Sequence, residues 1–271
     1  MSARVAMSAR VGLTIMLLYL VVAIFAPMMA PYRETEIVGE VWEPFGGATL
    51  LGTDQLGRDL LTRLIYGARN TISIAFATTM LSFAMGAMTG FLAAILGGWI
   101  DNILSRIVDI LMAIPILIFA LLILSILGTS VPVLIFVIAI LDSTRVFRLS
   151  RAVAMDVAVM EYVEVARLRS EGLWWLMRRE IFPNTLAPLV AEFGLRFCFV
   201  FLFISALSFL GLGIQPPAAD WGGMVRENAG AITFGIITPL LPAAAIAVLT
   251  IAVNLVVDWF LHHTSGIRDE S

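Results

Sequence analysis

Six long apolar segments constrain this chain more than any other feature of its sequence. They cover about residues 11–30, 72–96, 107–127, 131–146, 186–210 and 236–261. A helix of about 20 apolar residues is long enough to cross the roughly 30 Å of hydrocarbon in a bilayer. Because 60% of the 271 residues are hydrophobic, an ordinary soluble domain is excluded. The sequence predicts an all-α, polytopic membrane protein with six transmembrane helices.

The first apolar segment has an alternative interpretation, a cleaved signal peptide. It is longer than the 7 to 15 or so apolar residues of a signal-peptide core, and the one small-residue site near its end is followed by Pro31. We therefore expect an uncleaved span. The near-repeat MSARVA, MSARVG at the start of the sequence leaves Met1 and Met7 as alternative initiators.

A polar stretch from Glu161 to Asn184, EYVEVARLRSEGLWWLMRREIFPN, separates two apolar segments. We refer to it as the arginine-rich segment. Its apolar residues recur at helical spacing on both sides of Gly172, and Pro183 is expected to end the second helix. The pattern predicts two short amphipathic helices joined by a bend. Such helices rest on lipid headgroups or dock into a groove of a partner.

The arginine-rich segment resembles the cytoplasmic EAA loop of the membrane subunits of ABC importers. The matching residues are Tyr162, Val163, Glu164, Ala166, Arg167, Ile181, Pro183 and Asn184. The sequence departs from the family pattern at Val165, at Phe182 and at Ser170, where the family usually has glycine. We expect the nearby Gly172 to supply the permissive backbone instead. The resemblance implies that part of the segment couples this chain to an ATPase, namely Glu164, Ala166, Arg167, Ser170, Gly172, Ile181 and Pro183.

A second motif, LGTDQLGRDL, lies in the polar stretch between Tyr32 and Asn70. It resembles the GTDxxGRD signature of the second-type (C-type) permease subunit of dipeptide, oligopeptide and nickel importers. The matching residues are Gly52, Thr53, Asp54, Gly57, Arg58 and Asp59. The residues alone also fit a capped loop, in which Asp54 is a helix N-cap and Arg58 pairs with a neighbouring carboxylate.

A third motif, PPAADWG, follows the fifth apolar segment, and a PPxxxWG segment occurs in the same importer subunits. It contributes Pro216, Pro217, Asp220, Trp221 and Gly222. Two interpretations remain open. Trp221 could lie at the headgroup level, where tryptophan is enriched, or the loop could meet the binding protein that delivers substrate.

The arginines indicate the orientation. With six spans and a cytoplasmic N-terminus, eleven arginines face the cytoplasm and five face outward, namely Arg33, Arg58, Arg63, Arg69 and Arg226. Because cytoplasmic loops carry the excess of basic residues, we expect both termini and the arginine-rich segment in the cytoplasm.

Three opposite-charge pairs are spaced to lie on one helix face: Arg106 with Asp109, Asp142 with Arg145, and Glu192 with Arg196. In the expected topology they lie toward the cytoplasmic ends of the spans. Ion pairing near the headgroups is one interpretation. The alternative hypothesis is that Glu192 and Arg196 are gate charges that hold the cytoplasmic side of a pathway closed.

Motifs for catalysis and metal binding are absent from the sequence. The chain contains no lysine and therefore no phosphate loop of the GxxxxGK[ST] type. HExxH, GxSxG and Cys/His clusters are also absent, and the one cysteine, Cys198, lies in an apolar run. The net charge of −3 argues against nucleic acid as a partner. We expect no catalytic residue, metal site or cofactor in this chain.

The resemblances together imply a type I ABC importer fold in a bacterial inner (cytoplasmic) membrane. They imply a cytoplasmic N-terminus over residues 1–10, the first span and a periplasmic loop over 11–70, a core over 71–262, and a cytoplasmic tail over 263–271. The implied partners are a second, homologous permease in a heterodimer, two ATPase subunits carrying ATP and Mg, a substrate-binding protein and membrane lipid. Glu164 would accept hydrogen bonds from a basic residue of an ATPase, with Ala166 packed beneath it.

Two other functions remain as alternatives: an ion-coupled secondary transporter and a non-transporting membrane scaffold. A secondary transporter would need ionisable residues near the middle of its spans. The sequence leaves the substrate open among peptides, nickel chelates, glutathione and opine-like compounds.

Overall fold

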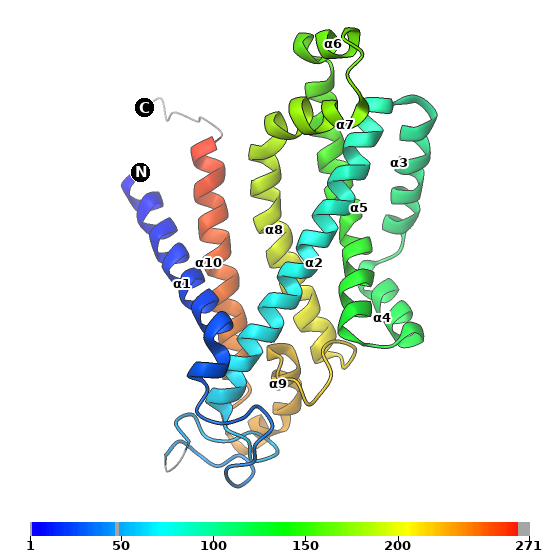
Figure 1. The fold of residues 1–271 in the computed structure, drawn as a ribbon. Helices are drawn as coiled ribbons and strands as arrows, with labels where there is room; N and C mark the ends of the chain where they lie inside the picture. The colour runs from blue at the N-terminus through cyan, green and yellow to red at the C-terminus, as the bar shows by residue number, and fades with distance from the viewer. Residues whose placement is uncertain (1, 47–48, 265–271) are drawn as a thin grey trace.

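The computed structural model describes residues 2–46 and 49–264 of the chain, and in these ranges nearly all regular structure is helical (Figure 1). The elements are α1 (Ser2–Met29), α2 (Leu60–Leu96), α3 (Gly98–Ala113), α4 (Ile116–Leu127), α5 (Val131–Ala158), α6 (Glu161–Leu168), α7 (Leu173–Trp175), the π-helix η1 (Leu176–Ile181), α8 (Phe182–Phe209), α9 (Trp221–Glu227), the 3₁₀-helix η2 (Ala229–Phe234) and α10 (Leu240–Thr264). The predicted all-α class is confirmed. Residues 265–271 of the predicted tail lie outside the described residues.

The number of spans differs from the predicted six. Among the described residues, four stretches are long and apolar enough to cross a membrane, Met7–Met29, Leu60–Leu96, Leu173–Phe209 and Leu240–His263, and a fifth is added if α3 and α4 count as one bent span. That pair is bent by 88°, so the apolar segment 107–127 is not one continuous helix. The break falls at Pro115, whose preceding residue Ile114 is extended, as the residue before a proline usually is.

Helices α2 and α5 are longer than the hydropathy pattern predicts. Helix α2 begins at Leu60 rather than near residue 72, and α5 continues past Val146 to Ala158. The extension of α5 carries Arg148 and Arg151, which lie beyond the predicted apolar segment 131–146. Their charges are neutralised by α3, because Arg148 pairs with Asp109 at 2.8 Å and Arg151 pairs with Asp101. The polar stretches 60–70 and 147–158 are therefore helical.

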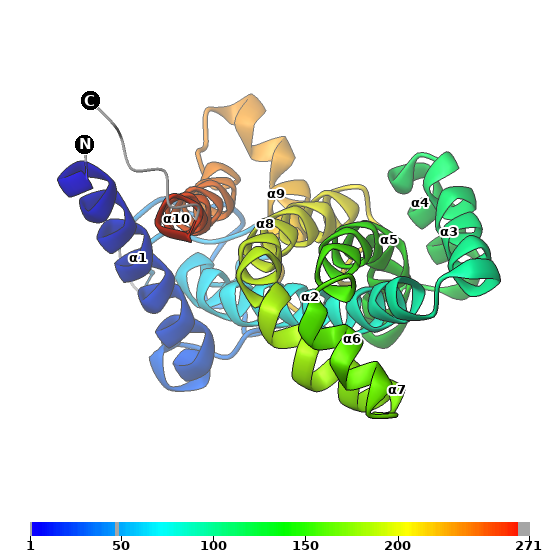
Figure 2. The same cartoon turned by 90° about the horizontal axis from the view of Figure 1, so that it is seen from above.

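The centre of the bundle is formed by α2, α5 and α8, with α1 and α10 together on one side and α3 and α4 on the other (Figures 1 and 2). Helix α2 packs most extensively against α5. Gly86 and Gly90 permit this approach, because a Cβ at either position would collide with the backbone of α5 at Ser143 or Phe147. The GxxxG spacing thus serves packing within the chain.

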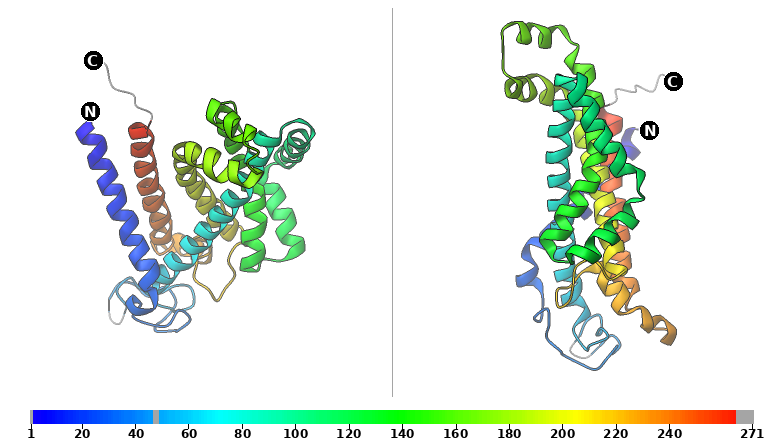
Figure 3. Two further views of the ribbon diagram at one scale, coloured as in Figure 1. Left: turned by 45° about the horizontal axis from the view of Figure 1, so that its top comes forward. Right: turned by 90° about the vertical axis from the view of Figure 1, so that its right-hand side faces the viewer.

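The two ends of the bundle differ in what they carry. The N-terminal end of α1 and the C-terminal end of α10 lie at the same end of the bundle as the arginine-rich segment, and α6 projects beyond the bundle there (Figures 1 and 3). The opposite end carries the long loop between α1 and α2 together with α9. We call these the segment end and the loop end.

Candidate functional site

The first helix of the arginine-rich segment, α6, has one buried and one exposed face. Val163 and Ala166 are buried against Leu176 of η1. Tyr162, Val165 and Leu168 are exposed, Leu168 by 80%, and Glu164 lies on the exposed side with them. Ala166 therefore packs beneath the exposed face of α6 on Leu176 of the same chain, and its part in ATPase coupling stays a prediction. The exposed face combines apolar side chains with a carboxylate, as a docking helix would.

The bend after α6 depends on Ser170, not on Gly172. Ser170 has a φ of +59°, whereas Gly172 has an ordinary φ of −71°. The amide of Ser170 donates to the carbonyl of Arg167 at 2.9 Å, and that of Glu171 donates to the carbonyl of Ala166 at 3.2 Å. These two bonds form a Schellman motif, whose left-handed position favours glycine. The expectation that Gly172 supplies the permissive backbone is wrong.

We expect Ser170→Gly to stabilise the protein by about 1 kcal/mol, because a left-handed backbone disfavours every L-residue and not glycine. Denaturant titration of the purified protein in detergent measures this change in the free energy of unfolding. Ser170→Ala is the matched control, since alanine keeps the strain. Equal stability of the glycine and alanine variants would contradict the assignment.

The second half of the arginine-rich segment continues into the membrane-spanning helix without a stop. Elements α7, η1 and α8 follow one another directly, and Pro183 lies in the first turn of α8. The amide of Phe182 donates to Met177, five residues back, as in a π-helix. The prediction that Pro183 ends the helix is wrong, because the helical run continues from η1 through Pro183 into α8. Buried Met177 and Ile181 tie this junction to the core.

The GTDxxGRD loop carries a buried ionic cluster at the loop end. Asp54 is fully buried and its Oδ2 lies 2.7 Å from Nε of Arg58 and 3.1 Å from Nη1 of Arg63. Oε2 of Glu227, on α9, lies 3.3 Å from Arg58 and 3.1 Å from Arg63. Burial raises the pKa of Glu227, and Arg58 opposes this shift. The four residues, which we call the loop-end cluster, join the loop, α2 and α9.

The other motif residues shape the loop around Asp54. Gly52 and Gly57 have φ values of +80° and +74°, and a Cβ at either would collide with a backbone carbonyl. Thr53 donates to the carbonyl of Glu40 at 2.5 Å. Asp59, not Asp54, caps α2 by accepting from the amide of Thr62 at 2.7 Å. The N-cap prediction for Asp54 is therefore wrong, and the predicted pairing of Arg58 with a carboxylate is confirmed.

Trp221 lies in the core of the bundle. It is 2% exposed, its Nε1 donates to the carbonyl of Leu64 at 3.0 Å, and its ring meets Tyr19 and Phe201 edge to face. A Cβ on Gly222 would collide with the backbone of Ser205. Trp221 is therefore a core residue that presents its ring neither to lipid nor to a protein partner. Pro216 and Pro217 are the exposed residues of this motif.

Comparisons with known proteins agree with these motifs. Residues 86–265, which include the arginine-rich segment, match the family described as binding-protein-dependent transport system inner membrane component. The chain belongs to this family. Residues 7–39 match the N-terminal transmembrane domain of oligopeptide transport permease C. The protein is accordingly a membrane-spanning permease subunit of a transporter and not an enzyme.

Several curated relatives cover most of this permease. The di/tripeptide transport system permease protein DppC of Pseudomonas aeruginosa is 37% identical over 95% of this chain and 85% of the relative. The dipeptide permease DppC of Haemophilus influenzae is 34% identical over 96% and 88%, and the glutathione permease GsiD of Pectobacterium atrosepticum is 30% identical over 95% and 84%. A crystal structure of an amino acid ABC transporter with histidines shares the fold, with a TM-score of 0.56 and 19% identity over 75% of this chain and 94% of that one.

The charges inside the permease pair differently from the predicted scheme. Glu192 and Arg196 do pair on α8, with Nε and Oε1 2.8 Å apart. Asp142 pairs across helices instead of with Arg145, since its Oδ1 lies 3.6 Å from Arg196 and its Oδ2 accepts from Ser82 of α2 at 2.7 Å. Arg106 does not pair with Asp109, whose partner is Arg148. We call Ser82, Asp142, Glu192 and Arg196 the interhelix charge cluster.

The position of the interhelix charge cluster also differs from the prediction. Asp142 and Arg196 lie near the middle of α5 and α8 rather than at their ends. The positions of these charged residues therefore do not argue against a secondary transporter. Membership of the binding-protein-dependent transport family does. The cluster links three central helices at one level of the permease.

The roles of several residues of the loop end were missed by the sequence analysis. Asn228 is fully buried; its Oδ1 accepts from Nε1 of Trp42 at 3.2 Å and from the amide of Gln55 at 3.0 Å. Asp220 caps α9 and also accepts from Thr71 at 3.0 Å. An aspartate directly before a helix is a recognisable N-cap, so the capping role of Asp220 could have been predicted. No local pattern points to Asn228 or Glu227.

Proposed function

We propose that this permease forms half of the translocation pathway of an ATP-driven, binding-protein-dependent importer of di- or tripeptides or related small solutes. The observation that carries the proposal is the identity of 37% with a di/tripeptide permease over 95% of the chain. Glutathione remains the second candidate, because a relative that carries this name is 30% identical. Uptake of labelled dipeptide and labelled glutathione by cells with and without the gene tests both.

The proposed assembly contains a second, homologous permease, two ATPase subunits that bind ATP and Mg, and an extracytoplasmic substrate-binding protein. The exposed face of α6 supports the ATPase contact, since Tyr162, Val165 and Leu168 have no partner within the described chain and Glu164 lies beside them. Co-purification of ATPase subunits supports this assembly. Their absence would favour a non-transporting scaffold.

The proposed orientation in a bacterial inner membrane places the segment end in the cytoplasm. The start of α1 and the end of α10 lie at that end of the bundle (Figure 1), and the arginine count favours the cytoplasmic side for it. The loop end then faces the binding protein. The exposed turn at Pro216 and Pro217 precedes α9. Helix α9 is bound to α2 through the loop-end cluster.

Coupling is proposed to pass from α6 through the Schellman turn and η1 into α8. Because α7, η1 and α8 are continuous, a displacement of the docked helix moves α8 with it. ATP-driven closure biases the permease between inward and outward states only if the docked contact differs in free energy between them. In this proposal Glu164, Arg167, Ser170, Gly172, Ile181 and Pro183 act as contact or junction residues.

We propose that the interhelix charge cluster acts as the gate hypothesised for Glu192 and Arg196. The gate then lies near the middle of α5 and α8. Glu192→Gln removes one charge that faces Arg196 at 2.8 Å. A change of about 1 kcal/mol in the balance between states is expected to alter uptake or basal ATP hydrolysis about fivefold. Assays of uptake and of ATP hydrolysis in proteoliposomes test the gate role. Unchanged values of both activities would contradict it.

A further inference from the structure

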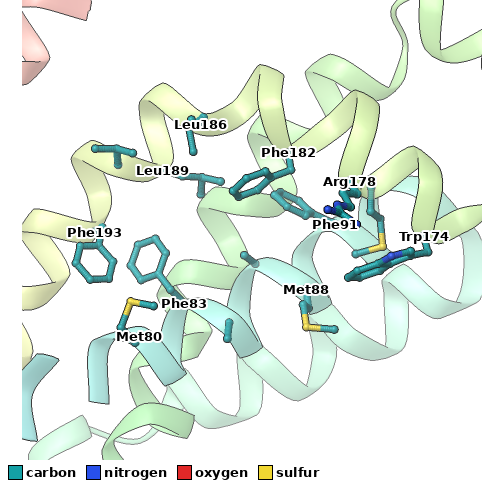
Figure 4. A pocket seen from close by; sticks show the side chains of 14 residues that line it. Met80, Phe83, Met88, Phe91, Trp174, Arg178, Phe182, Leu186, Leu189 and Phe193 are labelled. Atoms are coloured by element: carbon teal, nitrogen blue, oxygen red, sulfur yellow. The ribbon is translucent and has the colours of Figure 1, made fainter. Parts of the chain in front are cut away.

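An apolar groove lies between α2 and the continuous run α7–η1–α8 (Figure 4). Its volume is about 520 Å³, within the range of pockets that hold small ligands. Its wall consists of phenylalanine, methionine, leucine, alanine and valine side chains, with Trp174 and Arg178 as the exceptions. The residues that line this groove belong neither to the interhelix charge cluster nor to the exposed face of α6.

The two exceptions stand together at one end of the groove. Arg178 and Trp174 lie at the segment end, and Phe193 and Met80 lie at the opposite end (Figure 4). Arg178 is exposed, and among the described residues it forms no ion pair. The groove thus offers one unpaired cation at its mouth and an apolar wall beyond it.

The length of the groove matches one leaflet of a bilayer. From Phe182 to Phe193 the α8 wall extends about 16 Å at 1.5 Å per residue. The hydrocarbon core is roughly 30 Å thick, so one leaflet contributes about 15 Å. A ligand that fills this groove is therefore apolar over the depth of one leaflet and anionic where the leaflet meets water.

A transported peptide does not fit this description. Its charged termini would be buried along an apolar wall, which costs several kcal/mol per unpaired group (about 2–7 for a neutral one). Basic pockets between membrane-spanning helices, in contrast, bind anionic lipid head groups, and tryptophan is enriched at the headgroup level.

We propose that the groove binds an anionic phospholipid, with an acyl chain between α2 and α8 and its phosphate on Arg178. The lipid contacts η1 and α8 at the junction through which the arginine-rich segment connects to the bundle. This inference needs the chain to span the membrane and the groove to remain open to lipid in the assembled transporter, and it does not depend on the substrate.

The role of the Arg178 charge is tested with the full-length protein. The protein is purified with the subunits that accompany it and exchanged into nanodiscs of phosphatidylglycerol or phosphatidylcholine. Native mass spectrometry counts the retained phospholipids. Arg178→Gln should lower the preference for phosphatidylglycerol about tenfold, the effect of losing one charge-assisted contact. Arg179→Gln, the neighbouring exposed arginine that does not line the groove, should leave it unchanged. Equal preference in both variants and the parent protein would overturn the proposal.

The groove itself is tested by filling it. Ala84 is exposed and lines the groove, whereas Ala77 is exposed on the same helix outside it. Ala84→Trp should displace the retained phosphatidylglycerol, and Ala77→Trp should not. Retained lipid in the Ala84→Trp protein, or a crosslink from Ala84→Cys to a second permease in place of lipid, would contradict the lipid assignment.

Discussion

Replacement of Glu164 by arginine is expected to abolish substrate uptake while the permease remains folded. Glu164 lies on the exposed face of α6, and no ion pair within the described chain involves it. Charge reversal therefore costs the fold little. At a docked interface it places a cation against the basic residue proposed to bind Glu164, and like charges in contact cost several kcal/mol. Uptake should fall at least tenfold, with ATP hydrolysis no longer stimulated by substrate.

The measurement is uptake and ATP hydrolysis in proteoliposomes, with circular dichroism as the test of folding. Asp258→Arg is the matched control. Asp258 is an exposed carboxylate in the last turns of α10, at the segment end of the bundle and outside the arginine-rich segment. Normal uptake in the Glu164 variant, or an equal loss in the Asp258 control, would show that the charge of α6 is not the coupling contact.

Replacement of Asp54 by alanine should lower the free energy of unfolding by about 3–5 kcal/mol. The carboxylate neutralises Arg58 and Arg63, and Arg63 is 1% exposed. Removing it leaves two guanidinium groups to share Glu227 in a buried site. It also removes the acceptor for the amides of Leu56 and Arg58, so the loop loses its central support.

Thermal or denaturant unfolding in detergent measures this loss. The control is Asp109→Ala, which breaks the pair with Arg148 at 2.8 Å. Both side chains of that pair are about half exposed, so the change should be within about 1 kcal/mol. A small effect at Asp54, comparable with that at Asp109, would mean that the loop-end cluster does not stabilise the protein.

The sequence predicted features that depend on neighbours in the chain. The pairing of Arg58 with Asp54 and of Arg196 with Glu192 follows from a spacing of four residues, which brings the side chains together locally. The partner of Arg63 could not be predicted, because Glu227 lies far along the chain on α9. The same holds for Asp142 and Arg196, which meet only when α5 packs on α8.

Helix ends were the least predictable feature, and the reason is again tertiary pairing. Hydropathy placed the end of α5 near Val146, since the arginines that follow are expensive in hydrocarbon. Asp101 and Asp109 of α3 neutralise two of them. Proline was ambiguous as well: Pro115 breaks a predicted span, whereas the helical run continues through Pro183. The π-helical turn η1 directly before Pro183 is not revealed by the apolar pattern.

Docking of α6 against an ATPase is tested most directly by a site-specific crosslink. In a Cys198→Ser background, Leu168→Cys places a reactive thiol at the most exposed position of the α6 face, and Met28→Cys places one at the loop end, where Met28 is 82% exposed. A heterobifunctional reagent, thiol-reactive at one end and photoreactive at the other, applied to the assembled transporter should join Leu168→Cys, and not Met28→Cys, to an ATPase subunit. A crosslink from Met28→Cys, with none from Leu168→Cys, would contradict the coupling role of the arginine-rich segment.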